Sequence, residues 1–172
     1  IASGLANYGR SDLPEGTSLG IAASGAETRY NPSFVACIAQ VAVDKNSAAI
    51  DVQKLICAID AGIVINPDGV RAQVEGSLMW GLSAALLEKM TLDNGRVAER
   101  NFDTYKWQNI TKIPELEIHI VENGIHPSGV GEPATCVVAP AIGNAIFNAT
   151  GVRLRSLPFS REELFEGLES KA

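Results

Sequence analysis

Residues 34–59 read FVACIAQVAVDKNSAAIDVQKLICAI, and this stretch decides the fold of the chain. Its first part, residues 34–44, is a long and nearly continuous apolar run of the kind that forms a buried β-strand. A polar turn at residues 45–47 separates it from a second apolar run, residues 49–59. Two apolar runs joined by a short polar turn predict a β-hairpin.

A helix start follows the hairpin directly. Gly62 is expected to bend the chain out of the strand, while Asn66 suits the N-cap position and Pro67 the first helical position. Apolar side chains then recur at every fourth position, which predicts a helix from Pro67 to about Leu87 with one face packed on the sheet. This apolar face consists of Val70, Val74, Leu78, Leu82 and Leu86.

The same helix contains two glycines in its interior. Gly76 and Gly81 each cost roughly 1 kcal/mol relative to alanine, so we expect a neighbouring helix or a bound ligand to approach the backbone closely. A second face of the helix consists of Gln73, Ser77, Trp80 and Ala84.

Weaker patterns suggest the remaining strands and helices. Asp93-Asn94-Gly95 predicts a tight hairpin turn. Residues 116–121 are expected to form an edge or half-buried strand, and residues 153–157 a short strand.

A helical pattern runs over residues 136–148, where Pro140 should kink or restart the helix and Gly151 should close it. A terminal helix is expected over residues 161–168 with Ser160 as its N-cap.

These elements together predict an α+β fold, with mixed or antiparallel strands packed against two principal helices. Residues 1–28 are rich in Gly, Ser and Ala without a clear period, and we interpret them as a connecting arm. Residues 29–160 are expected to form the domain itself, and residues 161–172 a terminal helix and tail.

Composition excludes several classes of partner. A net charge of -6, without any run of basic residues, argues against a nucleic-acid partner. No apolar stretch reaches the roughly 18 residues of a membrane span. Two histidines do not suggest a zinc site, and the three scattered cysteines, Cys37, Cys57 and Cys136, are expected to be buried as small hydrophobic residues.

Residues 129–134, GVGEPA, are the most informative short motif. Glycines allow close approach to the backbone, and Pro133 suits the first turn of a helix. Glu132 would then lie at a helix entrance, where a carboxylate is favoured and where it could serve as a positioned base. The alternative, about equally well supported by these six residues, is that Glu132 only caps the helix.

The same motif also matches the loose dinucleotide fingerprint G-x-G-x-x-A. That fingerprint needs its glycines at the tip of a buried strand and an acidic residue about twenty positions later. Seven residues separate Val121 from Gly129, and no acidic residue stands at the required distance, so we reject a dinucleotide site.

Two long strings carry a specific resemblance: AIDAGIVINPDGVRAQVEGSLMWGLSAAL and GVGEPA. With the apolar strand at residues 34–44 and the segment 101–107, they resemble the C-terminal part of the molybdenum-binding subunit of the xanthine dehydrogenase and aldehyde oxidase family. The isoquinoline 1-oxidoreductase type of large subunit is the most similar in pattern. The resemblance runs from about Gly20 to Phe159.

The resemblance implies roles for individual residues. Glu132 corresponds to the family's general base, and Gln73 to a glutamine that contacts the molybdopterin cofactor. Gly129 and Gly131 correspond to the loop that approaches the metal centre. Judged without the family, Gln73 is better interpreted as a solvent-facing helix residue, and that alternative stays open.

The resemblance also implies the reaction and its components. An aldehyde or N-heterocycle would be oxidised with oxygen derived from water at a molybdopterin centre, in the cytosine dinucleotide form. Electrons would leave through 2Fe-2S clusters on a partner chain or domain, because three scattered cysteines cannot hold a cluster.

The chain lacks the N-terminal motifs of such a subunit, so we expect a fragment that is inactive alone and needs the remainder of the subunit and an iron–sulfur small subunit. Bacterial cytoplasm and periplasm both stay open as compartments. The alternative is a non-catalytic structural or assembly domain that keeps the fold.

Overall fold

The computed structural model describes residues 13–27 and 32–171 of the chain. Four strands form the main sheet in the order β1-β2-β3-β6. Strand β2 (Pro32–Asp44) pairs antiparallel with both β1 (Thr17–Glu27) and β3 (Ala49–Asp60). Strand β6 (Glu115–Val121) lies parallel to β3 at the other edge. The expected hairpin at residues 34–59 is confirmed, and the sheet is mixed.

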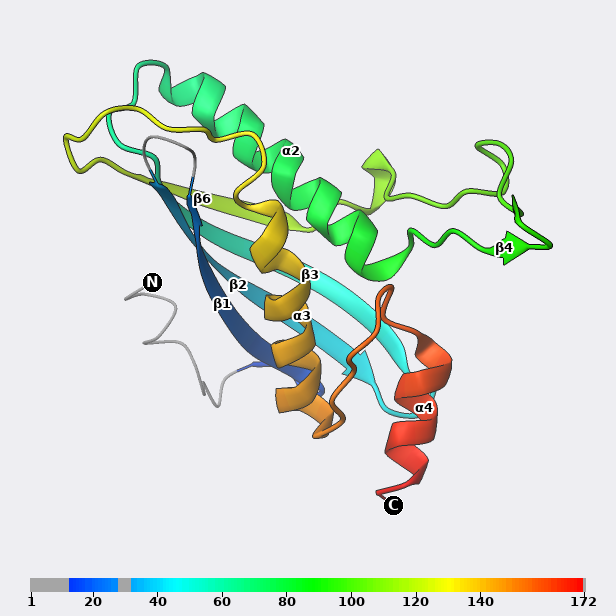
Figure 1. Ribbon diagram of the computed structural model, residues 1–172. Coiled ribbons are helices and arrows are strands. Elements are labelled where there is room, and N and C mark those ends of the chain that lie inside the picture. Colours follow the sequence, from blue (N-terminus) through cyan, green and yellow to red (C-terminus); the bar gives the residue numbers. More distant parts are fainter. Residues whose placement is uncertain (1–12, 28–31, 172) are drawn as a thin grey trace.

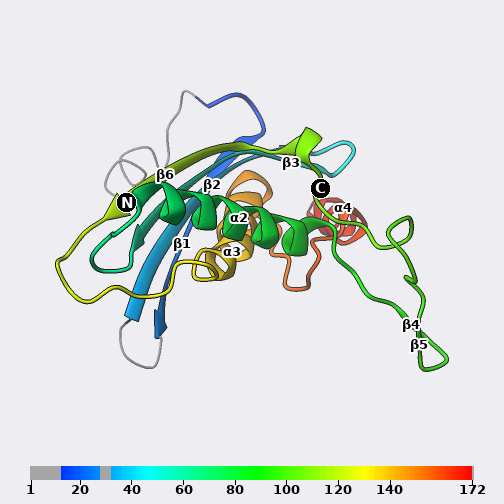
Figure 2. The same cartoon turned by 90° about the horizontal axis from the view of Figure 1, so that it is seen from above.

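Two helices cover one face of this sheet (Figures 1 and 2). Helix α3 (Thr135–Thr150) packs against β1 and β2, and helix α2 (Pro67–Leu86) packs against α3 and the edge strand β6. The predicted α+β fold with two principal helices is therefore confirmed. Between the helices and the sheet lie fully buried side chains from both layers, including Val41, Leu55, Ile59, Val74, Leu78, Leu82, Val138, Ile142 and Ile146.

The start of α2 follows the sequence prediction closely. Gly62 has a φ of +79°, a left-handed conformation that glycine adopts without strain. The side chain of Asn66 accepts a hydrogen bond from the backbone N–H of Gly69 at 3.0 Å, and Pro67 is the first helical residue. The first N–H groups of a helix have no partner within the helix. Asn66 supplies a partner for one of them, and Pro67 has no N–H that would need one.

Helix α3 runs without a break from Thr135 through Pro140, so the expected restart at that proline does not occur. Gly151 ends the helix in the left-handed conformation with a φ of 72°, as predicted. The last helix, α4 (Arg161–Glu169), begins with the hydroxyl of Ser160 accepting from the backbone N–H of Glu163 at 3.2 Å.

The expected connecting arm is wrong where it can be compared with the structure. Residues 17–27 form strand β1, and residues 1–12 lie outside the described residues. The small side chains that hid this strand in the sequence are what the packing requires. A Cβ atom on Gly20 would lie 2.1 Å from the carbonyl oxygen of Ala141, so β1 and α3 can approach only at a glycine.

Two smaller expectations are also wrong. The segment 153–157 forms no strand, although Leu154 is buried. Cys136 is exposed on the first turn of α3, whereas Cys37 and Cys57 are buried in the core as predicted.

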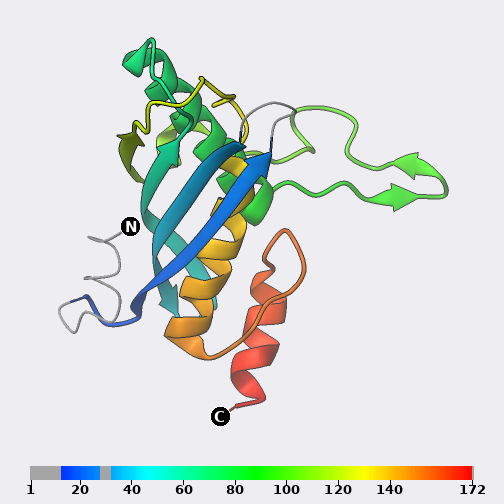
Figure 3. The ribbon, with the colours of Figure 1, turned by 60° about the vertical axis from the view of Figure 1, so that its left-hand side comes forward.

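A long segment, residues 87–114, separates α2 from β6 and projects from the body of the molecule (Figure 3). It contains the predicted hairpin, formed by β4 (Leu92–Asp93) and β5 (Arg96–Val97), and a 3-10 turn, η1 (Ile110–Lys112). We call residues 87–114 the projecting segment. None of the helices in the described part of the chain is long and apolar enough to cross a membrane.

Candidate functional site

The predicted site residues around Glu132 lie in a second irregular segment, residues 122–134, which joins β6 to α3 and which we call the glutamate loop. This loop passes over the end of the sheet beside the start of α2 (Figure 1). Its backbone is bound to the chain that leaves β3: the N–H of Ile63 donates to the carbonyl of Ile125 at 2.9 Å, and the N–H of Ser128 donates to the carbonyl of Ala61 at 2.8 Å.

Gly62 has a second function at this contact. A Cβ atom there would lie 2.4 Å from the carbonyl oxygen of His126 and 2.8 Å from that of Ile125. Real Cβ atoms do not approach backbone this closely. The glycine that turns the chain out of β3 therefore also lets the glutamate loop lie against it.

A buried serine holds the loop from the side of the sheet. Ser33, near the start of β2, is 0% exposed. Its hydroxyl donates to the carbonyl oxygen of Gly129 at 2.7 Å, and its Oγ lies 3.0 Å from the Oγ of Ser128. The glycine at the beginning of the GVGEPA motif is thus bound to the start of β2, an inner strand of the sheet.

A second buried serine holds the far end of the loop, where α3 begins. The Oγ of Ser77 lies 2.9 Å from the Oγ1 of Thr135, and the Thr135 hydroxyl donates to the Ser77 carbonyl at 3.2 Å. One turn further along α2, Gly81 faces the same residue, and a Cβ on Gly81 would lie 2.8 Å from the Thr135 carbonyl oxygen. The close approach expected at Gly81 is confirmed.

The structure brings Gln73 and the GVGEPA motif together, although 58 positions separate Gln73 from Gly131. A Cβ on Gly131 would lie 3.2 Å from the Oε1 of Gln73, which is tighter than most real Cβ contacts. Both residues are exposed, and Glu132 follows directly in the chain. Gln73 therefore lies beside the GVGEPA loop ahead of α3, and we call Gln73 and Gly131, together with their neighbours in the motif Gly129 and Glu132, the Glu132 cluster.

Glu132 does not cap the helix. The N-cap residue of α3 is Ala134, which makes no side-chain cap hydrogen bond. Only the backbone of Glu132 takes part in the turn, its carbonyl accepting from the N–H of Thr135 at 2.9 Å. Glu132 is exposed and follows Gly131, the residue that lies close to Gln73. The capping interpretation thus finds no support at this helix end.

Sequence reasoning assigned two neighbouring positions incorrectly. Ser77 was grouped with Gln73 on one helix face, but it is buried against Thr135 while Gln73 is exposed. Gly76 was expected to lie close to a helix or ligand, yet no described residue comes within 4 Å of a Cβ placed there. The difference arises because Gly81 lies on the buried face of α2 that meets α3, whereas Gly76 lies on an exposed face.

Sequence reasoning also missed the two anchoring serines. Ser33 was lost because the predicted strand began one residue later, at Phe34. The signal available was a hydroxyl immediately ahead of an apolar strand, which must find a partner if it is buried.

The exposed cluster fits a polar cofactor that approaches from outside the chain. Gly129 and Gly131 present bare backbone, and an added Cβ on Gly131 would press on the Gln73 amide. A primary amide both donates and accepts hydrogen bonds, which suits the ring nitrogens and carbonyl of a pterin. Among the described residues, no group of His, Cys, Asp and Glu is arranged to hold a metal ion directly, so a metal here would have to be carried by the cofactor.

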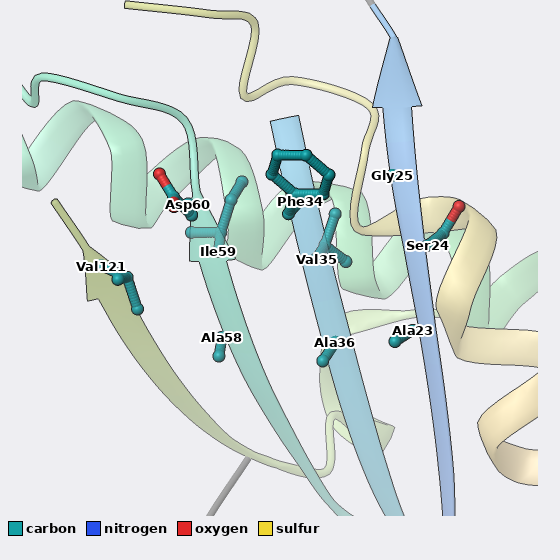
Figure 4. A pocket seen from close by; sticks show the side chains of 10 residues that line it. All are labelled: Ala23, Ser24, Gly25, Phe34, Val35, Ala36, Ala58, Ile59, Asp60 and Val121. Atoms are coloured by element: carbon teal, nitrogen blue, oxygen red, sulfur yellow. The ribbon is translucent and has the colours of Figure 1, made fainter. Parts of the chain in front are cut away.

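A separate cavity of about 480 Å³ lies at the same end of the sheet but on the opposite face (Figure 4). Phe34, Ala36 and Ala58 line it, and they alternate along their strands with the core residues Val35 and Ile59. Phe34 is 51% exposed. The cavity is almost entirely apolar and does not reach the Glu132 cluster.

A model of the molybdopterin cofactor-binding domain family matches residues 15–114. The matched range includes Gln73 and ends before the glutamate loop. Relatives with known names extend the similarity over almost the whole chain.

The chain is 43% identical over 164 residues to the membrane-bound aldehyde dehydrogenase (pyrroloquinoline-quinone) of Gluconacetobacter polyoxogenes, covering 95% of this chain and 21% of that protein. It is 35% identical over 147 residues to isoquinoline 1-oxidoreductase subunit beta of Brevundimonas diminuta, covering 86% of this chain and 18% of that subunit.

A solved structure extends the comparison to three dimensions. The aldehyde oxidoreductase from Desulfovibrio desulfuricans ATCC 27774 superimposes with a TM-score of 0.68 at 30% identity, over 79% of this chain and 15% of that one. Fold and sequence thus define the class, which is a molybdopterin cofactor-binding domain of the kind found in proteins named as oxidoreductases.

The chain belongs to the molybdopterin cofactor-binding domain family, within the large subunits related to xanthine dehydrogenase and aldehyde oxidase. It spans about a fifth of the length of the relatives described above. The resemblance stated from the sequence is confirmed.

Proposed function

We propose that this chain is the part of a molybdenum hydroxylase large subunit that carries the general base, Glu132, for oxidation of an aldehyde or N-heterocycle with oxygen from water. The observation that carries the proposal is the contact between Gln73 and Gly131, next to Glu132. The proposed reaction needs a cofactor-contacting amide near a base. The closeness of Gln73 to Gly131, the chain neighbour of Glu132, supports this arrangement.

The individual roles follow from the chemistry of each group. When bound, the molybdopterin centre supplies the redox chemistry. The Gln73 amide holds the cofactor by hydrogen bonds, and Gly129 and Gly131 leave room for it to lie against the backbone. Glu132 accepts a proton during the oxidation, a role for which a positioned carboxylate typically contributes 10²–10⁴-fold.

Efficient proton transfer also requires that bulk water be kept out of the site. Glu132 is exposed in this chain. We therefore propose that the remainder of the large subunit covers the glutamate loop and forms the other wall of the substrate site, which explains why the isolated chain should be inactive.

We further propose that the cofactor is the cytosine dinucleotide form and that 2Fe-2S clusters on an iron–sulfur small subunit remove the electrons. Cys37 and Cys57 are buried in the core, and Cys136 lies on α3. This arrangement cannot supply the four ligands of a cluster, which supports an electron acceptor outside this chain. The name of the Gluconacetobacter relative gives a different cofactor, so metal analysis of the purified enzyme is an essential measurement.

The test replaces Glu132 by glutamine in the complete enzyme. Glu132→Gln keeps the size and polarity of the side chain but removes the base, so turnover of benzaldehyde and isoquinoline should fall at least about 100-fold. Molybdenum content per subunit should stay unchanged. Glu122→Gln, at the start of the same loop, is the matched control and should behave as wild type.

Near-normal turnover in Glu132→Gln would remove the assignment and would favour a structural or assembly role for the chain. A protein that contains no molybdenum would refute the cofactor assignment independently of Glu132.

A further inference from the structure

We propose that Ser33 and Ser77 are positioning residues for the catalytic base, holding the glutamate loop on both sides of Glu132. This inference rests on the proposed function of Glu132. It assigns a task to two serines that make no contact with substrate or cofactor in the scheme above.

The two anchors hold the chain on either side of Glu132. Ser33 binds the loop at Gly129, and Ser77 binds Thr135 at the first turn of α3. Glu132 lies midway between these two attachment points, three residues from each. A short segment fixed at both ends has few backbone conformations left, so the anchors define where the Glu132 backbone lies.

The two anchoring serines belong to rigid elements of the fold, β2 and α2. Ser33 belongs to β2, which pairs on both edges, and Ser77 belongs to the buried side of α2. Ser33 and Ser77 are 0% and 2% exposed. Buried hydroxyls keep their partners because a lost partner leaves a desolvated polar group without a hydrogen bond.

The residues of the loop that the anchors hold are exposed, in contrast to the two buried serines. Gly129, Gly131 and Glu132 are all exposed. Their position is therefore fixed by the hydrogen bonds of the buried serines Ser33 and Ser77. Misplacement of a reacting group by about 1 Å can lower the rate about 100-fold.

The experiment uses the complete large subunit together with its partner subunit, with benzaldehyde as the probe substrate. Ser33→Ala and Ser77→Ala remove one anchor each. Ser83→Ala is the matched control, because Ser83 is also a buried serine of α2 but its hydroxyl accepts from the backbone N–H of Gln108 in the projecting segment, at 2.9 Å. Molybdenum content, kcat and KM are measured for each variant.

We expect Ser33→Ala to lower kcat about 10-fold, within the range for a displaced catalytic group, with KM and molybdenum content unchanged. Ser77→Ala should act in the same direction, and Ser83→Ala should match wild type. Ser33→Thr keeps the hydroxyl and should restore most of the lost kcat. In hydrogen exchange, residues 128–131 should lose protection in Ser33→Ala but not in Ser83→Ala.

A double-mutant cycle separates positioning from general stability. If Ser33 acts through Glu132, Ser33→Ala should cause no further loss in the Glu132→Gln background, because there is no base left to misplace. An equal loss in both backgrounds, wild-type kcat in Ser33→Ala, or a parallel fall in molybdenum content would overturn the inference. Full activity in Glu132→Gln alone would instead refute the proposed function, so the two failures are distinguishable.

Discussion

The two long irregular segments of this chain are held in opposite ways. The glutamate loop is bound to β2 at Gly129 and to the chain after β3 at Ser128, and Thr135, directly after the loop, is bound to α2. The projecting segment is bound mainly to itself. The N–H of Ala98 donates to the Thr91 carbonyl at 2.8 Å, and the rings of Phe102 and Trp107 meet edge to face at 5.3 Å.

Their exposed side chains differ as well. Phe102 and Ile110 in the projecting segment are 79% and 84% exposed, although both are large and apolar. The glutamate loop exposes mainly glycines and polar side chains, and Ile125, at 41%, is its single exposed large apolar residue. The comparison teaches that contacts within this chain fix the backbone of its proposed catalytic loop, whereas the projecting segment leaves large apolar side chains exposed.

The largest effect on stability should come from the glycine that seats the glutamate loop. Gly62 and Gly95 have almost the same positive φ, +79° and +78°. Gly62→Ala adds a Cβ 2.4 Å from the His126 carbonyl oxygen, whereas the open position at Gly95, in the projecting segment, has nothing within 4 Å. We expect losses of about 3 kcal/mol for Gly62→Ala, from conformational strain plus overpacking, and about 1 kcal/mol for Gly95→Ala, from conformation alone. Urea unfolding of both variants measures the difference, and equal losses would show that the loop is not seated there.

The two glycines of α2 provide the next comparison. Replacement by alanine should gain about 1 kcal/mol of helix propensity at either position. Gly76→Ala should keep that gain, because its surroundings are open, whereas Gly81→Ala meets the Thr135 carbonyl and should lose about 1 kcal/mol net. Thermal unfolding should therefore shift in opposite directions. A stabilised Gly81→Ala variant would mean that the contact between α2 and α3 is looser than it is in the structure.

Self-association tests the apolar surface of the projecting segment. Purified alone, the chain should form oligomers, and Phe102→Ser should weaken them several-fold without lowering the unfolding temperature, because Phe102 is already exposed. Sedimentation velocity at several concentrations measures the change. A clean monomer for the wild-type chain would contradict the expectation.

The smallest effect should come from surface carboxylates, and it should disappear in acid. Hydrogen bonds from Lys54 and then His119 lower the pKa of Glu117 in β6, and a backbone hydrogen bond from Thr91 lowers the pKa of Glu99 in the projecting segment. A carboxyl whose pKa falls on folding adds stability above its unfolded pKa, and that stability is lost as the pH falls through its folded pKa. Glu117→Gln should therefore cost about 0.5 kcal/mol at pH 7 and nothing well below pH 4.

Glu99→Gln should leave global unfolding unchanged, because the projecting segment opens locally. A pH-independent loss in Glu117→Gln would show that Glu117 contributes by packing instead of charge.

Much of the fold was accessible from the sequence because its signals are local. The hairpin at residues 34–59, the Asn66 and Pro67 start of α2 and the Gly151 end of α3 each depend on side chains close in the chain. Strand β1 was missed because its evidence is not local. Position 20 must be a glycine because α3 packs directly against it, and α3 lies more than a hundred residues later in the chain.

The sequence by itself determined the family and the two principal helices, and it singled out Gln73 and Glu132 as candidate site residues, since each lies in a continuous motif. Only the tertiary structure decided that Gln73 lies against Gly131, that Ser33 and Ser77 face the glutamate loop, and that Gly81 and not Gly76 meets another helix. The physical reason is that such contacts depend on where helices cross and strands end. Those positions are set by packing of the whole core and not by the residues on either side in the chain.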